Sequence, residues 1–440
     1  MSPVFFLHTD IIFFITINGK EKYFSSQKND AATFCRLRPP KALNLELHCA
    51  IIEILKSREM GMKFIHTADL HLGKIVNGYS MLEDQVHALD QIKAYIEVHQ
   101  PDALIIAGDI YDRAQPPASA IRVYNAFLAD VLMRLKTPVL AIAGNHDGAE
   151  FLEFGRLVLE AGNYYVSGRF SQEPVKVILE DVAGVVNFYL LPFADHEVMR
   201  HVLEDDEVKS IADGVGKAID GWNIAKNERN VLIGHNFVIG SSSEAIESDS
   251  EKTIHVGGKG AVSVGCFGDF DYVALGHLHK VQNPSEIAHY SGSILKYSQS
   301  EVTHEKSVTL VEIDADGTCE KALLPLVPLR DMRHVKGELA DILSEVNDDT
   351  HLDYLHVTLT DTGAVAFPMA KLRNIYPNVM TLRLDRHIGK NAFDNTISNE
   401  QRENMTPRDM FAKFYETQKD ASPSKESLAY FEHIIKELKD

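Results

Sequence analysis

The amino-acid sequence predicts a layered α/β domain, followed by a small α+β unit and by two helices near the carboxyl end. The first observation is a series of short apolar runs that end in polar residues: Lys63–Ala68, Ala103–Ala107, Pro138–Ala143, Val231–Ile233 and Tyr272–Leu275. The second is that segments with helical spacing of apolar residues alternate with these runs. Runs of this length are typical of buried strands, and their alternation with helices is typical of α/β domains.

Residues 1–61 lack this alternation. Met62 opens directly into the first predicted strand and therefore has the position of a natural start. We interpret residues 1–61 as an N-terminal extension upstream of that start; a targeting or regulatory arm is the alternative. The apolar segment Val4–Ile17 is interrupted by polar residues and lacks both a basic start and a small-residue cleavage site, so no signal peptide is predicted.

Residues 62–329 form the predicted α/β domain. Two helices are indicated by apolar residues at helical spacing, which are Leu82, Val86, Leu89, Ile92 and Ile96 in the first, and Ile121, Tyr124, Leu128 and Val131 in the second. Ser241–Ser250 is rich in serine and glutamate without periodicity, and this composition predicts an exposed loop. The alternation ends at about Leu329.

Residues 330–390 are predicted to form the small α+β domain. Val335–Val346 has the pattern of a helix, and Leu355–Leu359 and Val379–Leu384 have the pattern of strands. Residues 391–405 are polar and predict a linker. Residues 406–440 are predicted to form two helices. The first opens at Pro407 and carries Met410, Phe411, Phe414 and Tyr415; the second, after a break at residues 421–424, carries Leu428, Phe431, Ile434, Ile435 and Leu438.

The composition is that of an ordinary soluble globular protein. The chain has 440 residues, of which 45% are hydrophobic and 24% charged, and its four cysteines form no Cys-x-x-Cys pair, which favours a reducing cytoplasm. The net charge of −19 discourages a purely electrostatic grip on nucleic acid, so that positive charge would have to come from metal ions or a basic partner. No stretch reaches the roughly 18 apolar residues that span a membrane.

The polar clusters that follow the strands have the chemistry of metal ligands. They are Asp69-Leu70-His71, Gly108-Asp109, Gly144-Asn145-His146-Asp147, Gly234-His235 and Gly276-His277-Leu278-His279. In the Asp-x-His and His-x-His pairs both side chains point to one side of an extended segment. Because strands present ligands at their carboxyl ends, we expect about eight nitrogen and oxygen ligands at one sheet edge, enough for two ions. Carboxylate and imidazole together suit manganese above all, with magnesium as the alternative.

These clusters resemble the signature of the calcineurin-like metallophosphoesterases. Within that superfamily, three stretches resemble the SbcD family of bacterial nuclease subunits, namely the residues from Ile65 to Lys74, those from Ala274 to His279, and Tyr290-Ser291-Gly292-Ser293 with Lys296-Tyr297-Ser298. The likeness runs from about Met62 to the carboxyl end. It implies a sandwich of two central sheets flanked by helices, with the small α+β domain as a cap.

The resemblance also implies roles for individual residues. It places one ion on Asp69, His71, Asp109 and His279, and a second on Asp109, Asn145, His235 and His277. A phosphodiester is then hydrolysed by in-line attack of an activated water, without a covalent enzyme intermediate. His146 matches the catalytic histidine. We expect the Asp112 carboxylate to hydrogen-bond His146 and fix its tautomer; a surface salt bridge to Arg113 is the alternative.

The implied function is that of a metal-dependent DNA nuclease subunit working with an SbcC-like coiled-coil ATPase. Members act on DNA ends and hairpins, as 3′-to-5′ double-strand exonucleases and single-strand endonucleases, in the cytoplasm at the nucleoid. They pair as homodimers within a heterotetramer. A small-molecule phosphodiesterase or phosphatase is the alternative enzyme, against which the residues after Pro328 count. A non-catalytic scaffold is disfavoured because every ligand position holds a competent residue.

Overall fold

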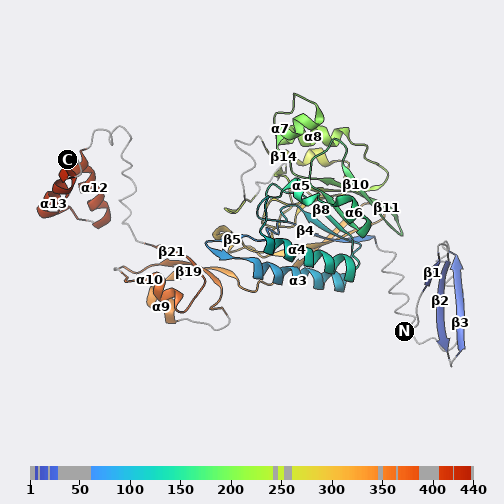
Figure 1. Ribbon diagram of the computed structural model, residues 1–440, viewed down its shortest axis with the longest axis horizontal. Coiled ribbons are helices and arrows are strands. Elements are labelled where there is room, and N and C mark those ends of the chain that lie inside the picture. Colours follow the sequence, from blue (N-terminus) through green and yellow to red (C-terminus); the bar gives the residue numbers. More distant parts are fainter. Residues whose placement is uncertain are drawn as a thin grey trace. The chain divides into compact units, whose positions relative to one another are not determined.

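The computed structural model describes residues 5–7, 10–17, 20–27, 61–240, 246–251, 260–344, 350–362, 365–385, 406–419 and 421–437 (Figure 1). The chain divides into two compact units, one of Met1–Gly61 with Glu180–Gly184, the other of Met62–Leu179 with Val185–Asp440. In the first unit, β1 (Phe5–Leu7), β2 (Asp10–Ile17) and β3 (Lys20–Gln27) pair as an antiparallel sheet, where the sequence interpretation assigned no strands.

The second unit is built around two sheets. A six-stranded sheet has the order β18-β17-β4-β7-β8-β9. Its strands are β4 (Met62–Thr67), β7 (Ala103–Ala107), β8 (Val139–Ile142), β9 (Tyr164–Ser167), β17 (Ser307–Ile313) and β18 (Cys319–Pro325). Strands β4, β7, β8 and β9 are parallel, whereas β17 is antiparallel to β4. The first three predicted strands are therefore confirmed as neighbours in one sheet.

A five-stranded sheet has the order β10-β11-β12-β15-β16. Its strands are β10 (Val175–Asp181), β11 (Gly184–Leu191), β12 (Arg229–Gly234), β15 (Tyr272–Leu275) and β16 (Ala288–Tyr290). Buried residues of both sheets form one core between them, including Phe64 and Ile105 from one sheet and Phe188 and Ile233 from the other. The period of two along each strand explains this, because Phe64 belongs to the central core whereas Ile65 belongs to the core on the opposite face.

Helices cover the outer faces of both sheets. On the six-stranded sheet lie α3 (Leu82–His99) and α4 (Ala118–Ala129), which continues as a π-helix over Asp130–Arg134. On the five-stranded sheet lie α7 (His196–Leu203) and α8 (Ile211–Gly221). The prediction of two central sheets flanked by helices is thus confirmed. None of the helices in the described residues is long and apolar enough to cross a membrane.

Shorter elements connect these layers. They are β5 (Ile75–Val76), β6 (Tyr79–Ser80), α5 (Ala149–Leu152), α6 (Arg156–Leu159), β13 (Val238–Ile239), β14 (Val262–Ser263), and short 3-10 turns at Glu160–Gly162, Val264–Phe267 and Gln299–Glu301. The predicted exposed loop Ser241–Ser250 is partly wrong. Residues 241–245 lie outside the described residues, but Ser248 is buried and Ser250 bonds to His279.

The small domain has the element order β19 (Met332–Gly337), α9 (Leu339–Ser344), β20 (Tyr354–Leu359), α10 (Pro368–Arg373) and β21 (Val379–Leu384). Its three strands are parallel. The helix predicted over Val335–Val346 is wrong at its start, because residues up to Gly337 pair with β20 and the helix begins at Leu339. Apolar residues before Gly337 fill the strand side of the same core, which gave them a misleading helical spacing.

Two helices near the carboxyl end match the prediction. They are α12 (Pro407–Lys419) and α13 (Lys425–Glu437). The rings of Phe411 and Phe431 stack with centroids 4.2 Å apart, so the two helices pack against each other. The predicted linker 391–405 and Leu438 lie outside the described residues.

A chain shortened to begin at Met62 is expected to fold and to bind metal as the full chain does. The reason is that the first strand of the second unit, β4, pairs with β7 and β17, and its core is formed by residues after Met62. We expect the melting temperature of the second unit to stay within about 2 °C, which corresponds to less than about 1 kcal/mol. Calorimetry of both chains measures this. An insoluble shortened chain would show that residues 1–61 belong to the working protein.

Candidate metal centre

The polar clusters follow strands of both sheets. Asp69 and His71 come after β4, Asp109 after β7, and Asn145 with His146 after β8, all in the six-stranded sheet. His235 follows β12, and His277 with His279 follow β15, both in the five-stranded sheet. The expectation of a single sheet edge is therefore wrong. The two sheets pack face to face, and the centre lies where the ends of both sheets meet.

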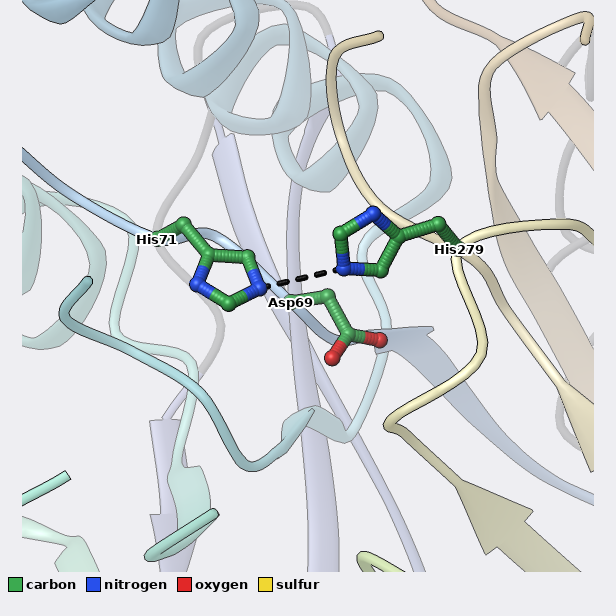
Figure 2. Close-up of side chains that lie close together, drawn as sticks. All are labelled: Asp69, His71 and His279. Atoms are coloured by element: carbon green, nitrogen blue, oxygen red, sulfur yellow. Dashed lines mark hydrogen bonds between the residues drawn. The ribbon is translucent and has the colours of Figure 1, made fainter. Parts of the chain in front are cut away.

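One group of donors joins the two sheets. Asp69, His71 and His279 each offer one atom, and these atoms lie within 4.8 Å of one another. Figure 2 shows the two imidazole rings facing each other beside the Asp69 carboxylate, with Nε2 of His71 3.1 Å from Nε2 of His279. All three side chains are buried. Two nitrogen lone pairs and a carboxylate that converge in this way need a proton or a cation between them.

Asp109 lies at the middle of the cluster. Its Oδ2 is 3.6 Å from Nε2 of His71, 3.4 Å from Nε2 of His235 and 3.9 Å from Nε2 of His146. Its Oδ1 accepts a hydrogen bond from the backbone N–H of His146 at 2.8 Å. A carboxylate with histidines on several sides has the position that a ligand bridging two ions requires.

The second side of the cluster contains His235, Asn145 and His277. Nε2 of His235 is 3.1 Å from Oδ1 of Asn145, and its ring centroid is 5.5 Å from that of His277. The backbone N–H of His277 also donates to both carboxylate oxygens of Asp69, at 3.0 and 3.1 Å. Within the described residues, the donor groups that converge within 4.8 Å include Asp109, His146 and His235 but not the ring of His277.

Hydrogen bonds at Nδ1 fix the orientation of three of the rings. Nδ1 of His235 lies 2.8 Å from the carbonyl oxygen of Ala107, and Nδ1 of His146 lies 2.8 Å from that of Asp112. Nδ1 of His279 lies 3.1 Å from the carboxylate of Glu301. A carbonyl or carboxylate can only accept, so each Nδ1 carries the proton and each Nε2 keeps its lone pair for a cation.

The Asp112 prediction named the right residue but the wrong atom. The backbone carbonyl of Asp112 is the partner of His146, whereas its carboxylate lies 2.7 Å from Nζ of Lys74 and 3.8 Å from Nδ1 of His71. Arg113, the predicted alternative partner, is farther away at 3.9 Å. The tautomer of His146 is therefore set by the main chain.

The backbone around the centre is strained. Asp69, His71, Asp109 and His277 have positive φ angles of 52°, 44°, 49° and 98°. Such conformations cost about 1–3 kcal/mol each and persist where the surroundings or a function require them. Gly276 is required because of close approach, since a Cβ there would clash with the carbonyl oxygen of Ala107 and lie 2.7 Å from Nδ1 of His235.

Burial and charge shift the ionisation of the cluster. Burial raises the pKa of Asp69 to about 7, against the opposing effect of His235 and His279. Burial also opposes the ionisation of Asp109, but the neighbouring histidines, His235 first, outweigh it and hold its pKa well below the usual range. Burial lowers the pKa of His235, yet the carboxylates of Asp109 and Asp69 outweigh burial and raise it to about 9. The cluster therefore holds protons that a cation would displace.

The donor set fits divalent cations. Carboxylate oxygens, imidazole nitrogens and one amide oxygen are ligands that manganese accepts together, and magnesium accepts the oxygens among them. The convergence of Nε2 atoms on Asp69 and Asp109 is the observation behind this fit. The buried Asp and His groups are compatible with a dinuclear metal site.

Sequence reasoning missed several residues that support the cluster. Gln85 of α3 donates to the carbonyl oxygens of Leu70 and His71, and Ser250 and Glu301 contact Nδ1 of His279. These residues lie far from the ligands in sequence. The only signal was the stretch from Tyr290 to Ser298, which was part of the resemblance and received no role. Asp147, in contrast, was correctly interpreted as a supporting residue, since its carboxylate accepts from the backbone N–H groups of Ile110, Tyr111 and Gly144.

The affinity of this centre for Mn²⁺ is expected to fall as the pH is lowered. A cation needs unprotonated ligands, whereas the pKa is about 9 for His235 and about 7 for Asp69. Binding displaces one proton between these values and a second below about pH 7, and each displaced proton changes the affinity by about tenfold per pH unit. Calorimetric titration in buffers of different ionisation enthalpy measures both quantities. An affinity that stays constant from about pH 6 to 9 would contradict the expectation.

Comparisons with known proteins point to one family. A family model described as calcineurin-like phosphoesterase matches residues 62–281, and SbcD_C, described as type 5 capsule protein repressor C-terminal domain, matches residues 328–419. The SbcD subunit of the SbcCD nuclease of Staphylococcus epidermidis is 36% identical over 330 residues, which cover 73% of this chain and 85% of that protein.

Two solved structures also resemble the chain. The protein TT1561 of Thermus thermophilus has a TM-score of 0.36 at 10% identity and covers 60% of this chain and 99% of its own. A dimetal phosphatase from Danio rerio has a TM-score of 0.38 at 12% identity and covers 61% of this chain and 100% of its own. The family assignment rests on the sequence comparisons.

Proposed function

Because the chain belongs to the calcineurin-like phosphoesterases and, among them, to the SbcD family of nuclease subunits, we propose that it hydrolyses phosphodiester bonds of DNA at this metal centre. The observation that carries the proposal is the convergence of buried carboxylate and imidazole donors on Asp109. The activity that fits the family is 3′-to-5′ exonuclease action on double strands and endonuclease action on single strands and hairpins.

The ligand assignment is part of the proposal. One ion is held by Asp69, His71, Asp109 and His279, and the other by Asp109, Asn145, His235 and His277. The distances of 3.1 Å between His71 and His279 and of 3.1 Å between His235 and Asn145 support these two sets. We propose manganese as the metal, with magnesium as the alternative. Two divalent cations supply neutralisation of the phosphodiester charge and activation of a water molecule.

His146 is proposed to move a proton. Its Nδ1–H is held by the carbonyl of Asp112, so its Nε2 is the end of the ring that faces the centre. At 8% exposure His146 is the most accessible of the clustered histidines, the others being at most 3% exposed. A protonated Nε2 can therefore reach a bound phosphodiester and donate its proton to the leaving sugar oxygen.

A comparison of two substrates tests the proposed function. With Mn²⁺ present, the full chain is expected to degrade a linear duplex DNA labelled at one 5′ end, and to release mononucleotides from the opposite 3′ end. A chromogenic phosphodiester measures the intrinsic hydrolytic activity of the centre. Hydrolysis of the small ester without any action on duplex, single-stranded or hairpin DNA would contradict the nuclease proposal. The metal content after gel filtration is measured on the same sample, because a scaffold would retain no manganese.

We also propose a division of labour along the chain. Residues 62–329 form the nuclease domain, residues 330–390 the cap, residues 391–405 a linker, and residues 406–440 the docking element for an SbcC-like coiled-coil ATPase. The name of the staphylococcal relative includes a complex of two kinds of subunit, which supports such a partner. Helices α12 and α13 support the last assignment, because their exposed faces carry large apolar groups: Met410, Phe414, Tyr430 and Ile434.

Truncation after Glu403 is expected to abolish binding of the ATPase while leaving hydrolysis by the nuclease domain unchanged. The double variant Phe414→Ala with Ile434→Ala is the finer probe, because these side chains are 63% and 37% exposed. Loss of an apolar anchor of about 2 kcal/mol weakens binding about 30-fold. Affinity is measured by calorimetry with the purified ATPase. Glu426→Gln, an exposed polar change on α13, is the matched control. Unchanged binding of the truncated chain would exclude this element as the main contact.

Pairing of two nuclease domains is proposed as well. A surface groove of about 390 Å³ between α3 and α4 is almost wholly apolar and contains Leu82, Val86, Leu89, Val123 and Phe127. Such a groove suits burial against a second copy of the same helices. Sedimentation equilibrium of the full chain measures this, and a chain that stays monomeric at micromolar concentration would contradict it.

A further inference from the structure

A buried acid–base pair lies beneath the metal centre and belongs to neither proposed ligand set. Glu301 is 0% exposed and Lys306 8% exposed, and Nζ of Lys306 lies 2.6 Å from Oε2 of Glu301. Burying two charges costs several kcal/mol per ion unless their contacts offset it. A pair in this position therefore calls for an account of what it holds.

The pair holds His279 at both ends. Nζ of Lys306 donates to the carbonyl oxygen of His279 at 2.8 Å, and Oε1 of Glu301 lies 3.1 Å from its Nδ1. Ser250 completes this contact, because its Oγ lies 2.8 Å from the same Nδ1 and donates to the same carboxylate oxygen. The backbone N–H of His279 donates to Glu251 at 2.7 Å. The main chain and the ring of this residue are thus fixed together.

This support differs from that of the other oriented rings. Nδ1 of His235 and of His146 face neutral backbone carbonyls, whereas Nδ1 of His279 faces a carboxylate. A carboxylate partner makes an imidazole a stronger metal ligand than a carbonyl partner does, and loss of such partners typically weakens metal binding by about 10–100-fold. The two ions of the centre therefore differ in how their histidines are supported.

We propose that Glu301, held in place by Lys306, is the positioning residue that aims Nε2 of His279 at the metal centre. The ion bound by Asp69, His71 and His279 depends on this carboxylate, and the ion bound by Asn145, His235 and His277 does not. The inference rests on the ligand sets of the proposed function. It assigns a role to a residue whose only sequence signal was its position after the Lys296-Tyr297-Ser298 stretch.

Calorimetric titration of the full chain with Mn²⁺ tests the proposal, with binding rather than activity as the readout. Glu301→Gln is expected to weaken one of two binding steps by about 10–100-fold and to leave the other unchanged. Glu305→Gln, the same chemical change at an exposed site four residues on, is the control and should leave both steps unchanged. Glu301→Gln combined with Lys306→Met removes both buried charges together and is used if the single variant fails to fold; the same selective weakening is expected.

The outcomes separate this proposal from the proposed function. If the parental chain binds fewer than two Mn²⁺ ions, the ligand sets themselves are wrong. If it binds two ions, and a folded variant without the Glu301 carboxylate binds both with parental affinity, the positioning role is overturned. Equal weakening of both steps overturns it too, because a merely structural role would not distinguish the ions. The melting temperature of each variant is measured alongside.

Discussion

Replacing His277 or His71 by alanine is expected to abolish metal-dependent hydrolysis while the fold persists. Each substitution removes one of the few imidazoles that face Asp69 and Asp109. Stabilisation of the reacting phosphate by a bound cation is worth several kcal/mol, and about 4 kcal/mol corresponds to about 10³-fold in rate. We therefore expect the rate on DNA and on a chromogenic phosphodiester to fall by at least about 10³-fold. The metal content of each variant should fall from two ions towards one.

The control for this experiment is His201→Ala, which changes an exposed histidine of α7. Its rate, metal content and melting temperature should equal those of the parental chain. His71 and His277 lie after strands that pair with neighbours in their sheets, so circular dichroism of their variants should be unchanged as well. If His277→Ala cleaves DNA at the parental rate, the ligand assignment is wrong. This is the weaker of the two positions, because the ring of His277 lies outside the closest donor groups among the described residues.

His146→Asn is expected to keep both ions and to lose most of the turnover. The ring of His146 lies edge-on to that of His71, with centroids 4.7 Å apart, and its Nε2 is 3.9 Å from Oδ2 of Asp109. It is thus close enough to reach a phosphate bound at the centre. General acid catalysis is typically worth about 10²–10⁴-fold, so kcat should fall by that factor. Metal content and rate must be measured on the same sample.

A second measurement distinguishes proton transfer from a role as a ligand. If His146 donates a proton, a substrate with a nitrophenolate leaving group, which needs little protonation, should lose less activity than DNA in the variant. Loss of metal in parallel with activity would instead make His146 a ligand. The observed group of His71, Asp109 and His146 is compatible with either role, which is why the measurement decides between them.

The sequence determined the strands and the order in which they carry polar residues. Five apolar runs predicted five strands, and each is present with its polar cluster at the end, as at Asp109 after β7 and His235 after β12. These features are local, because burial of a short run and the residue that follows it depend on neighbouring positions alone. The helices were predictable for the same reason, from the spacing seen in α3 and α4.

Only the tertiary structure decided which of these residues meet. His71 and His279 are 208 positions apart, and no local pattern reveals that their Nε2 atoms lie 3.1 Å from each other. The sequence could not assign the strands to two sheets, because the sheets are defined by pairing between distant segments. It also could not show that Asp112 uses its backbone carbonyl, or that Glu301 and Lys306 lie beneath His279. The sequence thus determined the chemistry available at each strand end, and packing of the two sheets determined which donors share a centre and what orients them.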